Sequence, residues 1–342
     1  MPLSLADIAK KLVAPGKGIL AADESEGTIA KRFAVIGLPV TLETRRDYRE
    51  MLFRTDEAMR DCISGVILTE ETLKQSAADG TPFSQLFAAA DVVPGIKVDR
   101  GAFSMPGGRG EKITEGLDGL RERLKHYAEV GAGFAKWRGV IAINDIAPSR
   151  NGIRANAHLL ARYAALCQEA GIVPVVEPEV LADGEPGDHG IDRCAEVTAE
   201  TLAAVFDELR VAGVDFSGML LKPNMVTPGV RSRDRVPADE VARQTVDVLK
   251  AHVPAAVPGI AFLSGGLSDE QATANLSAMN SLGPLPWALT FSYGRALQSA
   301  ALMAWGGEAA NVGAAQRAFA HRARMNALAA LGRWRPELDK AA

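Results

Sequence analysis

The stretches "FAKWRGVI" (residues 134–141) and "IVPVVEPEV" (residues 172–180) carry the pattern that decides the fold. Each is a short run rich in Val, Ile or Phe, as is typical of a buried parallel strand. Six further runs share the pattern: "GILAAD" (18–23), "GVILTE" (65–70), "PGIKVD" (94–99), "GMLLKPN" (218–224), "GIAFLSGG" (259–266) and "ALTFSYG" (288–294). The chain is therefore predicted to contain eight buried strands.

Longer segments with apolar residues three and four apart separate these runs, and they are predicted to be helices. Examples are "LDGLRERLKHYAEVG", "ANAHLLARYAALCQEAG", "VTAETLAAVFDELRVAG" and "DEVARQTVDVLKAHV". Eight alternating units predict a (β/α)8 TIM barrel, an α/β fold, as a single domain over residues 1–342. A last helix follows Gly306, and a short irregular tail, "GRWRPELDKAA", is expected after it. An open doubly wound sheet is the alternative, but no GxGxxG follows the first strand.

Composition narrows the class of protein. The 342 residues are 47% apolar and 23% charged, the profile of a soluble globular protein, and the net charge is −4. A negative surface disfavours binding to nucleic acid or to an anionic membrane, and no run approaches 18 apolar residues. We see no signal peptide at the start of the sequence, and three scattered cysteines suit a reducing compartment, so a cytoplasmic location is expected.

Charged side chains gather at the predicted strand ends, where the chemistry of such a barrel lies. Lys136 and Arg138 face one side of their strand, because side chains alternate, and so do Glu177 and Glu179. Strands four, five and six are neighbours in a barrel. We therefore expect Lys136, Glu177 and Lys222 to meet at its mouth.

Lys222 is the predicted nucleophile. It follows two leucines and precedes Pro223, so it lies deep in apolar sequence. Neighbouring cations and desolvation are expected to lower the pKa of a lysine, and its neutral amine attacks ketones and aldehydes. The alternative is a structural ion pair with a glutamate. Glu177 and Glu179 are predicted to serve one in proton transfer and the other in orienting the cations, with one carboxyl protonated and the other ionised.

Two groups of residues are predicted to bind phosphate. The loops after the last two strands supply glycines, hydroxyls and a helix N-terminus, which together bind anions. A second group lies in the loop after Asp23 and at the ends of strands three and four. The first group is Ser264, Gly265, Gly266, Ser292, Gly294 and Arg295, and the second is Ser25, Thr28, Lys97 and Arg138.

Histidine positions argue against a metal site. His126, His158, His252 and His321 fall in helical segments, and His189 falls in a loop. None is at a strand end, so no metal and no other cofactor is expected at the barrel mouth.

Seven motifs, in order along nearly the whole chain, resemble those of the class I fructose-1,6-bisphosphate aldolases. They are "LAADES", "GIKVD", "FAKWR", "GIVPVVEPE", "LLKPNMVTPG", "FLSGG" and "WALTFSYGRALQ". The resemblance implies a metal-independent barrel, usually a homotetramer, acting on phosphorylated sugars. It implies that Lys222 forms a Schiff base with the ketose, with Asp23, Lys136, Arg138, Glu177 and Glu179 around the imine. It also implies that the first phosphate group of residues binds near C1 and the second near C6.

Other classes remain alternatives. A different lysine-dependent aldolase or a transaldolase would differ in its products, and a metal-dependent aldolase would lose activity in a chelator. A non-catalytic binding or scaffold protein could also keep this fold. The presence of Asp23, Lys136, Glu177 and Lys222 disfavours that last class.

The resemblance suggests one departure from the family. Vertebrate members end in a tyrosine that helps proton transfer, whereas no tyrosine follows Tyr293 in this sequence. We therefore expect turnover to depend little on the last residues. Deleting residues 336–342 and measuring the cleavage rate tests this, and a large loss would contradict it.

Overall fold

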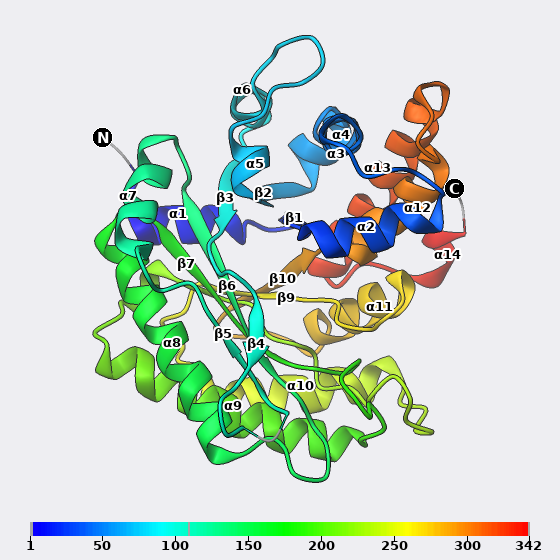
Figure 1. Ribbon diagram of the computed structural model, residues 1–342. Coiled ribbons are helices and arrows are strands. Elements are labelled where there is room, and N and C mark those ends of the chain that lie inside the picture. Colours follow the sequence, from blue (N-terminus) through cyan, green and yellow to red (C-terminus); the bar gives the residue numbers. More distant parts are fainter. Residues whose placement is uncertain (1–2, 109, 341–342) are drawn as a thin grey trace.

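The computed structural model describes residues 3–108 and 110–340. Eight parallel strands close into a barrel in the order β1-β10-β9-β8-β7-β6-β3-β2, and helices surround it (Figure 1). The barrel strands are β1 (Gly18–Ala22), β2 (Ile63–Leu68), β3 (Val93–Lys97), β6 (Phe134–Ile141), β7 (Val173–Val180), β8 (Leu220–Leu221), β9 (Gly259–Phe262) and β10 (Ala288–Tyr293). All eight predicted strands are confirmed, as is the single-domain (β/α)8 fold.

Helices surround the barrel: the first precedes β1, the last three follow β10, and the others lie in the connections between strands. They are α1 (Leu5–Leu12), α2 (Glu26–Val35), α3 (Leu42–Phe53), α4 (Asp56–Asp61), α5 (Glu70–Leu73), α6 (Phe83–Ala89), α7 (Leu120–Glu129), α8 (Arg150–Glu169), α9 (Ile191–Val211), α10 (Ala238–His252), α11 (Asp269–Asn280), α12 (Arg295–Trp305), α13 (Val312–Ala330) and α14 (Pro336–Asp339), with 3₁₀ turns at Phe216–Gly218 and Ala309–Asn311. The four helices predicted from apolar spacing are α7, α8, α9 and α10. Within the described residues, no helix is both long and apolar enough to span a membrane.

Three features differ from the prediction. A two-stranded antiparallel hairpin, β4 (Ala102–Ser104) and β5 (Lys112–Thr114), lies in the connection after β3. Strand β8 ends at Leu221, yet the N–H of Lys222 still donates to the Val176 carbonyl at 2.8 Å and so extends the pairing with β7.

The chain end is also more ordered than an irregular tail. Asp339 of α14 forms an ion pair with the buried Arg322 and lies 3.0 Å from His321 Nε2. Deleting residues 336–342 would therefore leave Arg322 without this carboxylate, so the thermal stability of the truncated protein must be measured together with its turnover. The predicted tail and the domain boundaries at residues 1 and 342 include residues 1–2 and 341–342, which lie outside the described part.

The lower barrel is filled by large side chains set against glycines. Residues Ala9, Leu12 and Val13, in and directly after α1, form one buried cluster with strand residues such as Phe134. The Phe134 ring lies where Cβ of residue 95 would stand, since a methyl added to Gly95 would be 2.3 Å from Phe134 Cζ. Glycine at 95 is therefore required for the ring to enter the barrel.

Gly95→Ala should lower the free energy of unfolding by about 1–3 kcal/mol, because a methyl there overpacks a filled core. Urea denaturation of the variant and the wild type measures the change. Gly27→Ala is the matched control, because nothing lies within 4 Å of its added methyl and its backbone is helical. Equal midpoints and slopes for Gly95→Ala and wild type would show that Phe134 does not fill this space.

Candidate active site

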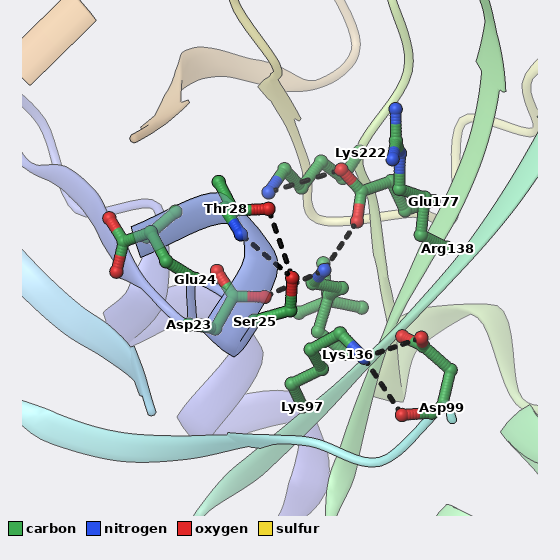
Figure 2. A network of polar contacts seen from close by, with 12 residues as sticks. Asp23, Glu24, Ser25, Thr28, Lys97, Asp99, Lys136, Arg138, Glu177 and Lys222 are labelled. Carbon is green, nitrogen blue, oxygen red and sulfur yellow. Dashed lines mark hydrogen bonds and ion pairs between the residues drawn. The ribbon is translucent and has the colours of Figure 1, made fainter. Parts of the chain in front are cut away.

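Two lysines and two carboxylates form the centre of the site (Figure 2). Lys136 and Glu177 lie within the adjacent strands β6 and β7, Lys222 directly follows β8, and Asp23 directly follows β1. Lys136 Nζ lies 2.8 Å from Asp23 Oδ2 and 3.1 Å from Glu177 Oε2. Lys222 Nζ lies 3.2 Å from the other oxygen of the same glutamate, Oε1. Glu177 thus joins the two lysines, and the predicted meeting of Lys136, Glu177 and Lys222 is confirmed.

These groups are largely removed from solvent: the side chains of Lys136, Glu177 and Lys222 are each 4–5% exposed, and that of Asp23 is 12% exposed. Burial raises the pKa of Asp23, but the ammoniums of Lys136 and Lys222 outweigh it and hold that pKa well below its usual range. The pKa of Glu177 is likewise lowered, because Lys136 and Lys222 overcome the effect of burial. Both carboxyls are therefore ionised at neutral pH.

Lys136 behaves in the opposite way to the expectation from sequence. Burial by itself would lower its pKa, but the charges of Asp23 and Glu177 raise it by a larger amount. The net shift is upward, so Lys136 stays an ammonium. The expectation that clustered lysines lower one another's pKa is therefore wrong for Lys136. The lowered pKa makes Glu177 the ionised member of the predicted pair, and Glu177 and Glu179 each face a cation rather than the other carboxylate.

Glu179 lies one layer further along β7 and forms an ion pair with Arg138 of β6. The charge of this carboxylate and its hydrogen bond raise the pKa of Arg138, whose side chain is 41% exposed. Glu179 also reaches the loop after β9, because its Oε1 lies 3.1 Å from the position that a Cβ at Gly265 would take. The predicted orienting role of one glutamate therefore has a geometric basis in Glu179.

Lys97 and the start of α2 form a second polar group. Lys97 Nζ donates to Asp99 Oδ1 at 2.6 Å and to the Asp99 carbonyl at 2.8 Å. Ser25 is the N-cap of α2, its Oγ accepts from the N–H of Thr28, and the two hydroxyls are 3.0 Å apart. Ser25 and Thr28 are thus ready to add hydroxyl donors at a helix N-terminus.

A cavity of about 470 Å³ lies against part of this site, and its volume is that of a small-molecule site. Glu177, Glu179 and Lys222 do not line it. It brings together the residues predicted on several strands with others that were not predicted. Its polar lining consists of Asp23, Glu24, Ser25, Thr28, Arg32, Lys97, Asp99, Arg100, Lys136, Arg138 and the backbone of Gly294.

Arg32, Glu24 and Asp99 are the main residues that the sequence analysis missed. Arg32 pairs with Glu24, which also lies 3.5 Å from the buried Arg49. Glu24 is next to Asp23 in sequence, and Asp99 lies two residues after Lys97. The strand-end rule that selected Asp23 and Lys97 would have found both carboxylates if it had been extended by two residues.

The predicted C1 phosphate residues lie on the loops after β9 and β10. Gly294 is the N-cap of α12 and lines the 470 Å³ cavity, and Arg295 begins that helix. Ser264 and Ser292 are buried, and Ser292 Oγ has no hydrogen-bond partner among the described residues. Gly265 and Gly266 line a neighbouring cavity of about 620 Å³ between α10 and α11.

The histidines lie where they were expected. His126, His158, His252 and His321 are on helices α7, α8, α10 and α13, and His189 is in the loop before α9. Among residues 3–108 and 110–340, no three His, Cys, Asp or Glu side chains are grouped in a way that would hold a metal ion.

The fold and this centre define a (β/α)8-barrel protein with a buried lysine pair at the carboxyl ends of its strands. The chain belongs to the class I fructose-bisphosphate aldolase family, whose family model matches residues 4–342. A probable fructose-bisphosphate aldolase class 1 of Xanthomonas campestris is 53% identical over 97% of this chain and 98% of its own. Fructose-bisphosphate aldolase C of Rattus norvegicus is 52% identical over 96% and 90%.

A solved structure has the same fold. Fructose-bisphosphate aldolase from Plasmodium falciparum, in a complex with TRAP and a small-molecule inhibitor, superposes with a TM-score of 0.93. Its sequence is 49% identical, and the match covers 97% of this chain and 95% of the other. The predicted family and fold are thereby confirmed.

The buried carboxylates should make stability depend on pH in a definite direction. The pKa of Asp23 is lower in the folded protein than its unfolded value near 4. Its contribution is therefore complete above about pH 5 and is lost as pH falls toward the folded pKa. Asp23→Asn should remove this part, so that its unfolding free energy changes less between pH 3 and pH 6, by about 1 kcal/mol.

Urea unfolding at intervals across that range measures the effect. Asp207→Asn is the control, because Asp207 is in an exposed pair with Arg210 and should keep the wild-type pH dependence. A wild-type pH dependence in Asp23→Asn would contradict the coupling between Asp23 and Lys136.

Proposed function

We propose that this protein is a Schiff-base fructose-1,6-bisphosphate aldolase, a carbon–carbon lyase. It reversibly cleaves fructose 1,6-bisphosphate to dihydroxyacetone phosphate and glyceraldehyde 3-phosphate, a step of glycolysis and gluconeogenesis. The observation that carries the proposal is the position of Lys222. Its amine is buried, lies 3.2 Å from Glu177, and faces no other carboxylate within ion-pair distance in the described chain.

The first half of the reaction forms the imine. Glu177 accepts a proton from the Lys222 ammonium, and the resulting amine attacks the C2 ketone of the sugar. Glu177 then returns a proton to the hydroxyl of the carbinolamine, which leaves as water. Lys136 remains an ammonium beside Glu177 and keeps that carboxylate ionised when it must act as a base.

The second half breaks the carbon–carbon bond. Asp23 or Glu177 accepts the proton of the C4 hydroxyl, and the C3–C4 electron pair moves into the iminium. Glyceraldehyde 3-phosphate leaves, an enamine remains on Lys222, and its protonation and hydrolysis release dihydroxyacetone phosphate. Positioned acid–base groups of this kind commonly contribute about 10²- to 10⁴-fold each.

The phosphate groups are assigned to the two ends of the site. We assign the C6 phosphate to Ser25, Thr28, Lys97 and Arg138, which line the same cavity. We assign the C1 phosphate to Ser264, Gly265, Gly266, Ser292, Gly294 and Arg295. Binding at both ends would hold the ketone within reach of Lys222 and make remote binding energy available at the reacting carbon.

We also propose that residues 1–342 form one domain, that it acts as a cytoplasmic homotetramer, and that it needs no cofactor. The tetramer follows from the family resemblance. The cytoplasmic location is supported by Cys62, Cys167 and Cys194, which are free thiols in the folded chain and suit a reducing compartment.

Lys222→Met should abolish cleavage of fructose 1,6-bisphosphate, because no other amine lies at this position. Borohydride added with substrate should reduce the imine and add the mass of the sugar phosphate to Lys222 of the wild type. Peptide mass spectrometry locates the adduct. Lys74→Met, which removes an exposed lysine paired with Glu70, is the control and should keep both rate and adduct. An adduct on any lysine other than 222 would overturn the assignment.

A further inference from the structure

Gln298 in α12 connects three other elements through one buried amide. Its side chain is 1% exposed. Its Nε2 donates to the Ala21 carbonyl of β1 at 2.6 Å. Its Oε1 accepts from the hydroxyl of Tyr48 in α3 at 2.9 Å and from Nη1 of Arg32 in α2 at 3.2 Å.

The partners fix the orientation of this amide. A backbone carbonyl only accepts and a guanidinium only donates, so the NH₂ group must face Ala21 and the oxygen must face Arg32. Burial, helped by Glu24, raises the pKa of Tyr48, so its hydroxyl stays protonated and donates to the same oxygen. Only one orientation of the Gln298 amide satisfies all three contacts.

The held guanidinium points at the N-terminus of α12. Arg32 Nη2 lies 3.3 Å from the position that a Cβ at Gly294 would take, and the Ala21 oxygen lies 3.4 Å from the same point. Arg32 and Gly294 both line the 470 Å³ cavity. Glu24 binds the same nitrogen, Nη1, that donates to Gln298, so these two contacts fix Nη1 and leave Nη2 facing Gly294.

We infer that Gln298 is a positioning residue for phosphate: it holds Arg32 beside Gly294, so that a phosphate at the α12 N-terminus meets this guanidinium as well as the helix. The inference rests on the proposed function. Gln298 touches no substrate, and its effect passes through Arg32. Loss of its oxygen leaves Arg32 with Glu24 alone, and the guanidinium then turns toward that carboxylate and away from Gly294.

Steady-state kinetics with fructose 1,6-bisphosphate tests the inference. Gln298→Met removes the polar atoms at similar volume and should raise KM about tenfold, with kcat within about threefold, because a contact to a charged group is lost. Arg32→Met should raise KM at least as much. The double variant should match Arg32→Met alone, because Gln298 acts only through Arg32.

Matched controls separate positioning from general destabilisation. Asn326 is also a fully buried amide, but it bonds Thr273 and the Arg322 carbonyl, away from the cavity. Asn326→Leu should lower the melting temperature and leave KM unchanged. Tyr48→Phe removes one donor to Gln298 but keeps Arg32 in place, so it should also keep the wild-type KM.

Gln298→Asn is a second test, because it retains an amide that is one methylene too short to join Ala21 and Arg32. It should also raise KM, and calorimetry should find weaker binding of inorganic phosphate to both Gln298 variants. An unchanged KM in both variants, or effects of Gln298→Met and Arg32→Met that add, would overturn the inference. Failure of the proposed function is a different result, because the wild type itself would then not cleave the bisphosphate.

Discussion

One buried carboxylate, Glu177, shared between two lysines is the constraint on which the mouth of the barrel depends. Ionised groups so far from water are costly unless each faces an opposite charge. Lys136 lies within β6, Glu177 within β7, and Lys222 directly after β8, so their pairing depends on the register between these three strands. The Arg138–Glu179 pair repeats the arrangement one layer above. Ion pairs, in addition to backbone hydrogen bonds, therefore stabilise this order of strands.

Several cations that line the cavity are paired with carboxylates of the chain. Lys97 faces Asp99, and Arg32 faces Glu24, in addition to the central pairs. Under the proposed function, an incoming phosphate meets cations that carboxylates of the chain already orient.

Much of the fold and of the candidate site was predictable, because both follow from patterns of neighbouring residues in the sequence. The strands are recognisable as Val- and Ile-rich runs. Charged residues such as Lys136 and Glu177 interrupt runs that must be buried, and so mark the site. The hairpin β4–β5 was missed because its strands have three residues each, and those of β4 are exposed, so no apolar pattern marks them. The partners of Arg32 were missed for another reason. Glu24 and Gln298 lie far apart in sequence, and only the packing of α2 against α12 brings them to one guanidinium.

The barrel closes between its first and last strands, and this has a consequence for biosynthesis. Ile19 of β1 pairs with Ser292 of β10, and Ala21 is bonded by Gln298, which is 277 residues further along the chain. A nascent chain therefore exposes the edge of β1 until nearly the whole protein has left the ribosome. Contacts of such long range slow folding and leave unpaired edges open to aggregation. During translation, the amino-terminal half of this chain is the part with most need of chaperone protection.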